Sequence, residues 1–346
     1  MHERNTTPWT LVNCQASTST RVIHIQSNML ITSHLFRSTT FRRLFPQQIR
    51  TYYQTYESLT ESLYSKTIPS VPLSYEKLSA KSDSVIPQTP ILILHGLFGS
   101  KSSNRTIGQR LSEKLSRDVY LLDLRNHGDS PHDPDHSYPA LSRDIEQFMD
   151  DQRIEDAIVI GHSMGAKAAM ALSLRSPALV KLLISVDNAP VNLPPTSSFV
   201  KYVELLEKIE GMRLTKLKEA KEIFMKVEPN ELVCNFILQN LKRDKADNNV
   251  LKSRVPLSIL HKAIITGEIS SWKFSPDPTK IFTKPTLFLR GLQSNYVADD
   301  YLRDLGQYFT NFEVKGLDCG HFVLYEKAQE SIDVISDFIE RHDEDY

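Results

Sequence analysis

The stretch AIVIGHSMGAKAAM, residues 157–170, constrains the fold of this chain more than any other. An apolar run typical of a buried strand is separated from an alanine-rich helical run by only Gly-His-Ser-Met-Gly. A turn this tight strains the backbone of Ser163 and leaves no room for side chains at Gly161 and Gly165. The pattern predicts a nucleophile elbow, with Ser163 between the end of a strand and the start of a helix.

Strands and helices are predicted to alternate around this turn. Apolar runs that suit strands buried on both faces of a parallel sheet lie at residues 91–94, 118–124, 156–161 and 179–187. The segments between them carry helical patterns, namely IGQRLSEKL, LSRDIEQFMDD and MGAKAAMALSLRS. The alternation predicts an α/β fold with a mostly parallel, doubly wound sheet.

The alternation is interrupted after Pro190 by a long block in which only helical patterns occur. Strand patterns return at 285–291 and 311–318, and a helical pattern closes the chain. We therefore expect a helical cap inserted above the strand ends, where open α/β sheets bind ligands. The expected segments are an N-terminal segment at 1–56, a linker with edge strands at 57–88, the first part of the core at 89–190, the cap at 191–276 and the second part of the core at 277–346.

The N-terminal segment differs in charge from the rest of the chain. No acidic residue lies between Glu3 and Glu57, whereas six arginines do. Removing residues 1–56 takes six of 41 basic and one of 42 acidic residues, which leaves 35 against 41. An acid-free, arginine-bearing segment rich in Ser and Thr predicts mitochondrial targeting; the alternative is a disordered tail. Met1 and Met29 are alternative start residues, and the RTYY pattern suggests cleavage near Tyr52.

Bulk composition excludes several other classes of protein. The formal net charge of −1 provides no basic field for nucleic acid or acidic lipid. No run approaches the roughly 20 apolar residues of a membrane span, and no secretory signal core is present. The three cysteines, Cys14, Cys234 and Cys319, show no metal-ligand spacing. We expect no cofactor and no metal.

The stretch ILILHGLFGS, residues 91–100, predicts the loop that completes an oxyanion hole. A nucleophile elbow needs a second N–H donor from the loop after an earlier strand. Leu97, directly after His95 and Gly96, is placed to supply it, and the N–H of Met164 supplies the other. We expect His95 to brace this loop rather than to transfer a proton.

His321 is the predicted general base. It lies in GLDCGHFVLYEKAQE, after the last strand, where a serine hydrolase of this order needs a histidine to take the proton of Ser163. The side chain of His162 is expected to point away from the nucleophile, and Cys319 to serve in packing. The remaining candidates lie in connections that do not fit this topology: His127, His132, His136 and His261.

The acidic partner of the base is absent from its usual place. In FLRGLQSNYVADD, residues 288–300, an Asp is expected about three residues after Gly291, where this chain has Ser294. Asp299 and Asp300 follow later and resemble acids of a first helical turn. Ser294 and Tyr296 are expected to shape the floor under the base or the acyl pocket.

Asp187 is the alternative acid. It lies 24 residues after Ser163, directly after the strand that follows the nucleophile helix. A carboxylate there can reach the imidazole of His321 and hold its tautomer. The competing interpretation is that Asp187 only caps the following Asn-Ala-Pro turn.

A further loop, at 121–138, is predicted to brace the oxyanion loop through a polar network of Asp123, Arg125, Asn126 and His127.

The motifs His-Gly-Leu-Phe-Gly-Ser, Asp-Leu-Arg-Asn-His-Gly, Gly-His-Ser-Met-Gly-x-Lys and Asp-Asn-Ala-Pro resemble an α/β-hydrolase branch of bacterial esterases and mitochondrial serine hydrolases. Over roughly residues 70–342, the chain is most similar to the yeast ethanol acetyltransferases. The resemblance implies a triad of Ser163, Asp187 and His321. It also implies formation of ethyl acetate from acetyl-CoA and ethanol in mitochondria, with side hydrolysis of esters and thioesters.

Three interpretations of function follow. The first is an alcohol acetyltransferase with acetyl-CoA, a short-chain alcohol and esters as its small-molecule substrates. The second is an ester or thioester hydrolase with the same triad and no significant transfer to alcohol. The third is an inactive fold kept as a binding module, which the intact nucleophile, base and oxyanion loop argue against. The sequence does not indicate an oligomeric state.

Overall fold

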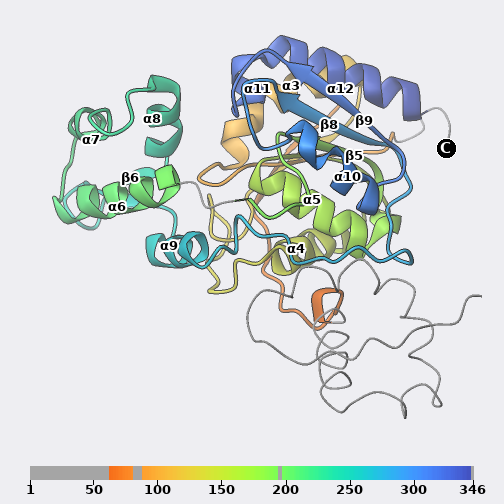
Figure 1. Cartoon of the computed structure of the whole chain (residues 1–346). Coiled ribbons are helices and arrows are strands. Elements are labelled where there is room, and N and C mark those ends of the chain that lie inside the picture. Colours follow the sequence, from red (N-terminus) through yellow and green to blue (C-terminus); the bar gives the residue numbers. More distant parts are fainter. Residues whose placement is uncertain (1–61, 81–87, 194–196, 344–346) are drawn as a thin grey trace, which may run out of the picture. The chain divides into compact units, whose positions relative to one another are not determined.

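The computed structural model describes residues 62–80, 88–193 and 197–343, which all belong to one compact unit spanning Leu59–Tyr346 (Figure 1). The targeting segment predicted at residues 1–56 lies outside the described residues, as do parts of the predicted linker at 57–88.

The core is a seven-stranded sheet with the strand order β1-β3-β2-β4-β5-β8-β9. Its strands are β1 (Tyr75–Leu78), β2 (Ile91–Leu94), β3 (Val119–Leu122), β4 (Ala157–His162), β5 (Val180–Val186), β8 (Thr286–Gly291) and β9 (Phe312–Leu317). The edge strand β1 runs antiparallel to β3, and all other pairs are parallel. The predicted α/β fold and its doubly wound, mostly parallel sheet are confirmed.

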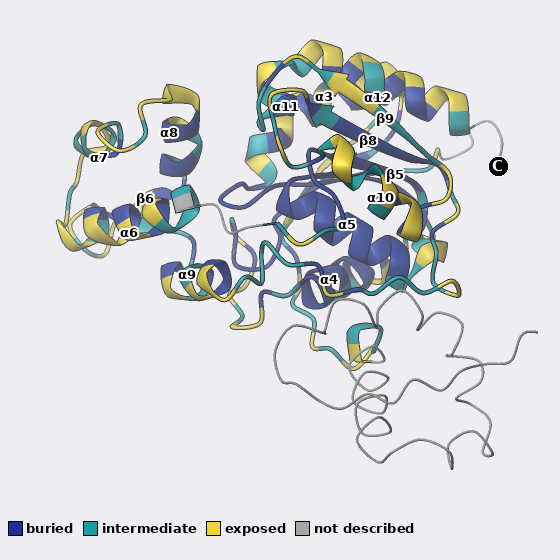
Figure 2. Ribbon diagram, in the orientation of Figure 1, coloured by how far each residue is buried: buried dark blue, intermediate teal, exposed yellow. Residues whose placement is uncertain are grey.

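Helices cover both faces of the sheet because its central strands are apolar on both sides (Figures 1 and 2). Side chains of β2 alternate between two cores: Ile91 and Ile93 join one, and Leu92 and Leu94 join the other. The first core includes α3 (Arg105–Leu115), α11 (Val323–Glu326) and α12 (Ala328–Asp343). The second includes α4 (Tyr138–Asp151), α5 (Met164–Arg175) and α10 (Leu302–Tyr308). Short 3-10 turns lie at Lys101–Asn104, Pro177–Leu179 and Asp299–Tyr301.

A cap separates the strands β5 and β8 in the sequence. It contains α6 (Ser197–Gly211), α7 (Leu217–Phe224), α8 (Glu231–Leu238), β6 (Leu241–Asp244), β7 (Val250–Ser253) and α9 (Leu257–Ile265). The expectation of helices only is therefore wrong at 241–253, where β6 and β7 pair as an antiparallel hairpin. Asn248 and Asn249 adopt φ values of 51° and 59°, a left-handed turn that asparagine tolerates and a helix cannot contain.

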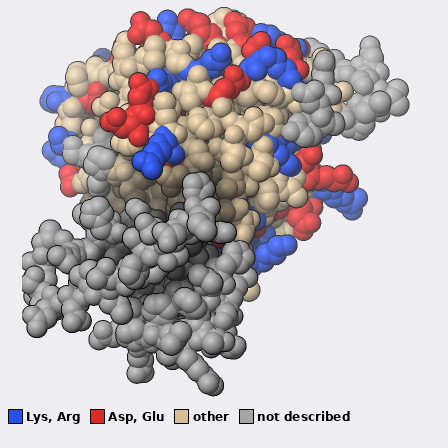
Figure 3. All heavy atoms as spheres, turned by 45° about the vertical axis from the view of Figure 1, so that its right-hand side comes forward, with Lys and Arg blue, Asp and Glu red and all other residues tan. Residues whose placement is uncertain are grey.

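The surface carries charges of both signs. On the face shown in Figure 3, Lys and Arg side chains are interspersed with Asp and Glu rather than gathered by sign. None of the described helices is both long and apolar enough to cross a membrane.

Candidate active site

Three residues predicted from separate parts of the sequence lie in one hydrogen-bonded chain. His321 Nε2 lies 2.9 Å from the hydroxyl oxygen of Ser163, and His321 Nδ1 lies 2.6 Å from Asp187 Oδ2. Because the carboxylate can only accept, Nδ1–H donates to Asp187, and Nε2 is left to accept the Ser163 proton. The chain order Ser, Asp, His is that of α/β-hydrolases.

The strand-to-helix turn around Ser163 has the strained geometry that the sequence predicts. Ser163 adopts φ 54° and ψ −116°, and its N–H donates to Val186 at the end of β5. A Cβ at Gly161 would lie 2.2 Å from the carbonyl oxygen of Gly165. A Cβ at Gly165 would lie 2.5 Å from the carbonyl oxygen of Leu94. These contacts explain why both positions must be glycine.

Asp187 is fully buried at the carboxyl end of β5, between the ends of β4 and β8. Its Oδ1 accepts the N–H of Gly291 at 3.0 Å, and its Oδ2 accepts the hydroxyl of Ser294 at 2.6 Å besides His321. Its own N–H donates to Leu289 of β8. The competing interpretation of Asp187 as a turn cap does not account for these contacts, all of which lie across the sheet.

The other acids of this region lie elsewhere. Asp299 is exposed and forms an ion pair of 2.6 Å with Arg290, and Asp300 is in the same exposed 3-10 turn. Neither contacts the imidazole of His321.

Two aromatic rings hold His321 in place. The ring of Tyr296 stacks on the imidazole, with centroids 4.1 Å apart and planes at 22°. His162 Nε2 donates to the backbone carbonyl of His321 at 2.9 Å, so it supports the base and does not contact the Ser163 hydroxyl. Burial, and secondarily the neighbouring His321, lower the pKa of His162 to about 4, which keeps its ring neutral.

The predicted oxyanion donors border a small cavity beside Ser163. The cavity holds about 30 Å³ of free space. Its walls are Leu97, Tyr138, Ser163, Met164, Asn188, Leu193, Phe199, Ile264, Ile269, Ser270 and Tyr296. Met164 is the first residue of α5, and within the described chain neither its N–H nor that of Leu97 donates a hydrogen bond. Two unpaired amides next to a serine hydroxyl can bind the oxyanion of a tetrahedral intermediate.

The oxyanion loop rests on two buried histidines. His95 Nε2 accepts the N–H of Leu124 at 3.0 Å, and His127 Nε2 accepts the N–H of Phe98 at 3.1 Å. Both imidazoles can accept because burial lowers the pKa of each, for His127 well below its ordinary value. The structure therefore places His95 as a brace of the loop. Asp123 contributes as well, since it accepts the backbone N–H of Lys101 at 2.6 Å.

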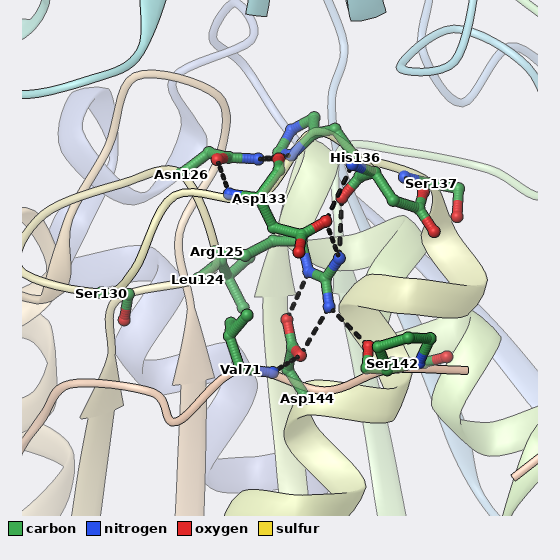
Figure 4. A network of polar contacts seen from close by, with 12 residues as sticks. Val71, Leu124, Arg125, Asn126, Ser130, Asp133, His136, Ser137, Ser142 and Asp144 are labelled. Carbon is green, nitrogen blue, oxygen red and sulfur yellow. Dashed lines mark hydrogen bonds and ion pairs between the residues drawn. The ribbon is translucent and has the colours of Figure 1, made fainter. Parts of the chain in front are cut away.

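Figure 4 shows the rest of the predicted polar network, around Arg125 and Asn126. Arg125 is buried and donates to both carboxylate oxygens of Asp144 in α4, at 2.6 and 2.7 Å. Asn126 donates to His136 at 3.1 Å. These contacts tie the loop after β3 to α4, and none reaches Ser163.

Two residues of the site, Asn188 and Lys167, lie in motifs quoted from the sequence but were assigned no role there. Asn188 donates through Nδ2 to the carbonyl oxygen of Ser163 at 3.0 Å and thereby supports the nucleophile turn. Lys167, fully buried in α5, donates to the carbonyls of Val191, Ser270 and Ser271 at 2.9, 2.8 and 3.2 Å. It thus joins the segments that enter and leave the cap. The sequence signal that could have indicated the role of Lys167 is a lysine within an alanine-rich helical pattern.

The thiol of Cys319 does not form a second reactive centre. Cys319 is buried, and burial raises the pKa of its thiol to about 11. Among the residues that the structure describes, no group of three or more His, Cys, Asp or Glu is arranged to hold a metal ion.

Comparison with known proteins agrees with this geometry. The chain is 42% identical over 306 residues to a "Probable alcohol acetyltransferase" of Saccharomyces cerevisiae, covering 84% of this chain and 89% of that protein. It is 34% identical to an "sn-1-specific diacylglycerol lipase ABHD11" of Xenopus laevis, covering 78% and 84% of the two chains. A solved structure, "Marine microorganism esterase", matches with a TM-score of 0.69 and 29% identity, over 78% of this chain and all of that one. Residues 89–328 match the family model described as "alpha/beta hydrolase fold", and the chain therefore belongs to the α/β-hydrolase family, as an enzyme of the hydrolase or acyltransferase type.

Proposed function

We propose that this protein is an alcohol acetyltransferase that forms ethyl acetate from acetyl-CoA and ethanol through an acetyl-Ser163 intermediate. The main observation in favour is the hydrogen-bonded chain from Asp187 through His321 to Ser163, beside a small and mostly apolar cavity. The cavity is lined mainly by apolar side chains, which suits an acyl group beside Ser163. The similarity to a probable alcohol acetyltransferase supports the same assignment.

In the first half-reaction, Ser163 attacks the thioester carbonyl while its proton passes to His321 Nε2. The carbonyl oxygen becomes an oxyanion that the N–H groups of Leu97 and Met164 stabilise. Asp187 holds the imidazole in the right tautomer and stabilises the imidazolium. Collapse of the intermediate breaks the C–S bond, and the imidazolium protonates the leaving coenzyme A thiolate.

In the second half-reaction, ethanol replaces coenzyme A at the acetyl group. His321 takes the hydroxyl proton of the alcohol as its oxygen attacks the acetyl-Ser163 carbonyl, and the same two amides stabilise the oxyanion. When the bond to Ser163 breaks, His321 returns the proton to the serine oxygen. The products are ethyl acetate and free enzyme.

Transfer must compete with hydrolysis, because water is present at about 55 M. With alcohol near 0.1 M, equal rates require a preference of several hundredfold, or on the order of 3.7 kcal/mol of differential barrier. An apolar cap over the site is a source of that preference, because it limits water around the acetyl-enzyme. Leu193, Phe199, Ile264 and Ile269 are apolar cavity residues from the cap and its connections.

The second candidate is an ester or thioester hydrolase without significant transfer to alcohol. It is favoured by the similarity to an esterase and to a diacylglycerol lipase, and it uses the same three side chains. The two candidates differ only in whether water or alcohol attacks the acetyl-enzyme.

An assay with purified protein and acetyl-CoA separates the two candidates. Ethyl acetate, free acetate and coenzyme A are measured with and without ethanol, using Ser163→Ala as the background. The acetyltransferase produces ethyl acetate at the expense of acetate as ethanol rises. Release of acetate with no ethyl acetate at any ethanol concentration would exclude it and leave the hydrolase.

We also propose that the protein acts in mitochondria. The support is the acid-free, arginine-bearing composition of residues 1–56. A fluorescent protein fused after residue 56 should be imported into mitochondria with this segment, and should remain outside when its six arginines are replaced by glutamine. Import of the substituted fusion would contradict the proposal.

A further inference from the structure

The oxyanion loop contains a tight turn at residues 96–99. Gly99 N–H donates to the carbonyl oxygen of Gly96 at 2.9 Å, which makes Leu97 and Phe98 the two central residues. Phe98 has a φ of 64°, a conformation that favours glycine at the second central position of a turn. A phenylalanine stays in it only when surrounding contacts hold it there.

Hydrogen bonds from opposite sides hold the backbone of Phe98. Its N–H donates to His127 Nε2 in the core, at 3.1 Å. Its carbonyl oxygen accepts the side-chain amide of Asn240 at 2.7 Å, and more weakly that of Gln239 at 3.4 Å. Gln239 and Asn240 belong to the cap, directly after α8. One side of the strained turn is therefore held by the cap and the other by the core.

Asn240 is fixed within the cap and is 3% exposed. Its backbone N–H and its side-chain amide both donate to the carbonyl of Ile237, each at 3.1 Å, and its carbonyl accepts the N–H of Arg254 at 2.8 Å. A second cap residue, Phe199 of α6, places its ring 6.3 Å from that of Phe98. The cap thus contacts Phe98 through both backbone and ring.

The conformation of this turn determines where the Leu97 N–H points. The carbonyl oxygen of Gly96 lies against Gly99 N at 2.9 Å and His95 Nδ1 at 2.8 Å. Because a trans peptide unit is planar, the N–H of Leu97 points opposite to that carbonyl. A rotation that relaxes Phe98 moves the Gly99 N–H and so weakens one of the two hydrogen bonds that fix this peptide unit.

We propose that Asn240 is a positioning residue through which the docked cap fixes the direction of the Leu97 N–H in the oxyanion hole. The inference rests on the proposed acetyl-serine mechanism and deepens it. When the cap is docked, Asn240 completes the turn and the hole has two aligned donors. When the cap moves away, the carbonyl of Phe98 loses its donors from the cap and the turn can relax. Nucleophilic attack is thereby coupled to the closed cap, the state in which the apolar cavity limits water.

The test compares four forms of the full-length protein: wild type, Asn240→Ala, Asn240→Asp and Asn235→Ala. Asn240→Asp keeps the side-chain volume and replaces the donor with an acceptor facing the Phe98 carbonyl. Asn235→Ala is the matched control, because Asn235 is an exposed asparagine of α8. Each form is assayed with p-nitrophenyl acetate for kcat and KM, for inhibition by trifluoroacetone, and for its melting temperature.

Removal of an oxyanion donor costs about 10²–10³-fold in rate, so misalignment of one donor should cost on the order of tenfold. We expect kcat of Asn240→Ala to fall by about that factor with little change in KM, and Asn240→Asp to fall at least as far. Trifluoroacetone forms a serine hemiketal whose oxygen occupies the hole, so its inhibition should weaken in parallel. Asn235→Ala should match wild type.

A purely structural role for Asn240 predicts a different result. It lowers the melting temperature of both Asn240 variants and leaves kcat and trifluoroacetone inhibition of the folded fraction unchanged. That result, or a loss confined to KM, overturns the inference. Ester cleavage does not depend on ethanol, so a wild type that cleaves the ester and makes no ethyl acetate refutes acetyl transfer without affecting the test of Asn240.

Discussion

The hydroxyl of Ser294 donates a 2.6 Å hydrogen bond to Asp187, and to the same carboxylate oxygen that holds His321. Ser294 occupies the loop after β8 where the acid of this fold is usually found. Since β5 and β8 are adjacent in the sheet, the ends of both strands lie on the same side of the imidazole, and the carboxylate after β5 contacts it. With Asp187 as the acid, the contact to the imidazole is kept. Ser294, at the usual position of the acid, donates a hydrogen bond to Asp187.

Replacing Asp187 by asparagine should lower kcat by about 10⁴-fold, because an amide does not hold the imidazole tautomer that accepts the Ser163 proton. Asp299→Asn and Asp300→Asn serve as matched controls and should stay within about twofold of wild type, since surface positions tolerate such changes. Steady-state ester cleavage measures all three. Strong loss in Asp299→Asn with an active Asp187→Asn would overturn the assignment of the acid.

Introducing an acid at the vacated position should rescue that loss. We expect the double variant Asp187→Asn, Ser294→Asp to recover about a hundredfold of the lost kcat, because the Ser294 side chain contacts the same carboxylate oxygen that holds His321 Nδ1. Ser294→Asp alone should be less active than wild type, since two adjacent carboxylates repel and share a proton. A double variant no more active than Asp187→Asn would show that the position next to Asp187 cannot orient the base.

The stacked ring of Tyr296 should matter for turnover. Aromatic stacking contributes about 0.5–1.5 kcal/mol, so Tyr296→Ala should reduce kcat by about 2–12-fold through a less ordered His321. Tyr296→Phe retains the ring and should lose less. Equal kcat for the alanine and phenylalanine variants would show that stacking on His321 does not assist turnover.

Lys167 should make stability depend on pH. Burial lowers the pKa of its ammonium to about 7, against an ordinary value of 10.5. Between these values the unfolded chain holds a proton that the folded chain lacks, so stability rises with pH in this window. The free energy of unfolding of wild type should therefore rise relative to that of Lys167→Met by up to about 1.4 kcal/mol per pH unit. Urea unfolding at several pH values above 7 measures this difference.

A lysine on the surface provides the control for that series. Lys218 is exposed in α7, and Lys218→Met should follow wild type at every pH. If the difference in free energy of unfolding between wild type and Lys167→Met does not change with pH, the three carbonyls keep the ammonium charged. A difference that narrows with rising pH would contradict the expected sign.

The core and the site residues could be predicted from the sequence because their signals are local. Strands buried on both faces read as continuous apolar runs, and the turn at Ser163 leaves two glycines in a fixed spacing. The order of the strands along the chain then places the catalytic histidine after the last strand, where His321 lies. The β6–β7 hairpin had a local signal as well, in Asn248 and Asn249, but the preceding helical pattern obscured it.

The remaining contacts depend on how distant segments dock. The bond from Asn240 to Phe98 exists only because the cap lies against the oxyanion loop, 142 residues away in sequence. Likewise, the carbonyls that receive the Lys167 ammonium come from the two ends of the cap. No local periodicity specifies such pairs, since tertiary packing decides them.

The acetyl-serine itself provides the most direct test of this account. Wild-type protein is mixed with acetyl-CoA, quenched in acid, digested and examined by mass spectrometry, in parallel with samples chased with ethanol. We predict that the peptide containing Ser163 gains one acetyl group, that the ethanol chase removes it as ethyl acetate, and that Ser163→Ala shows neither. Ethyl acetate formed without acetylation of Ser163, or acetylation at another residue that the chase releases, would contradict the proposed mechanism.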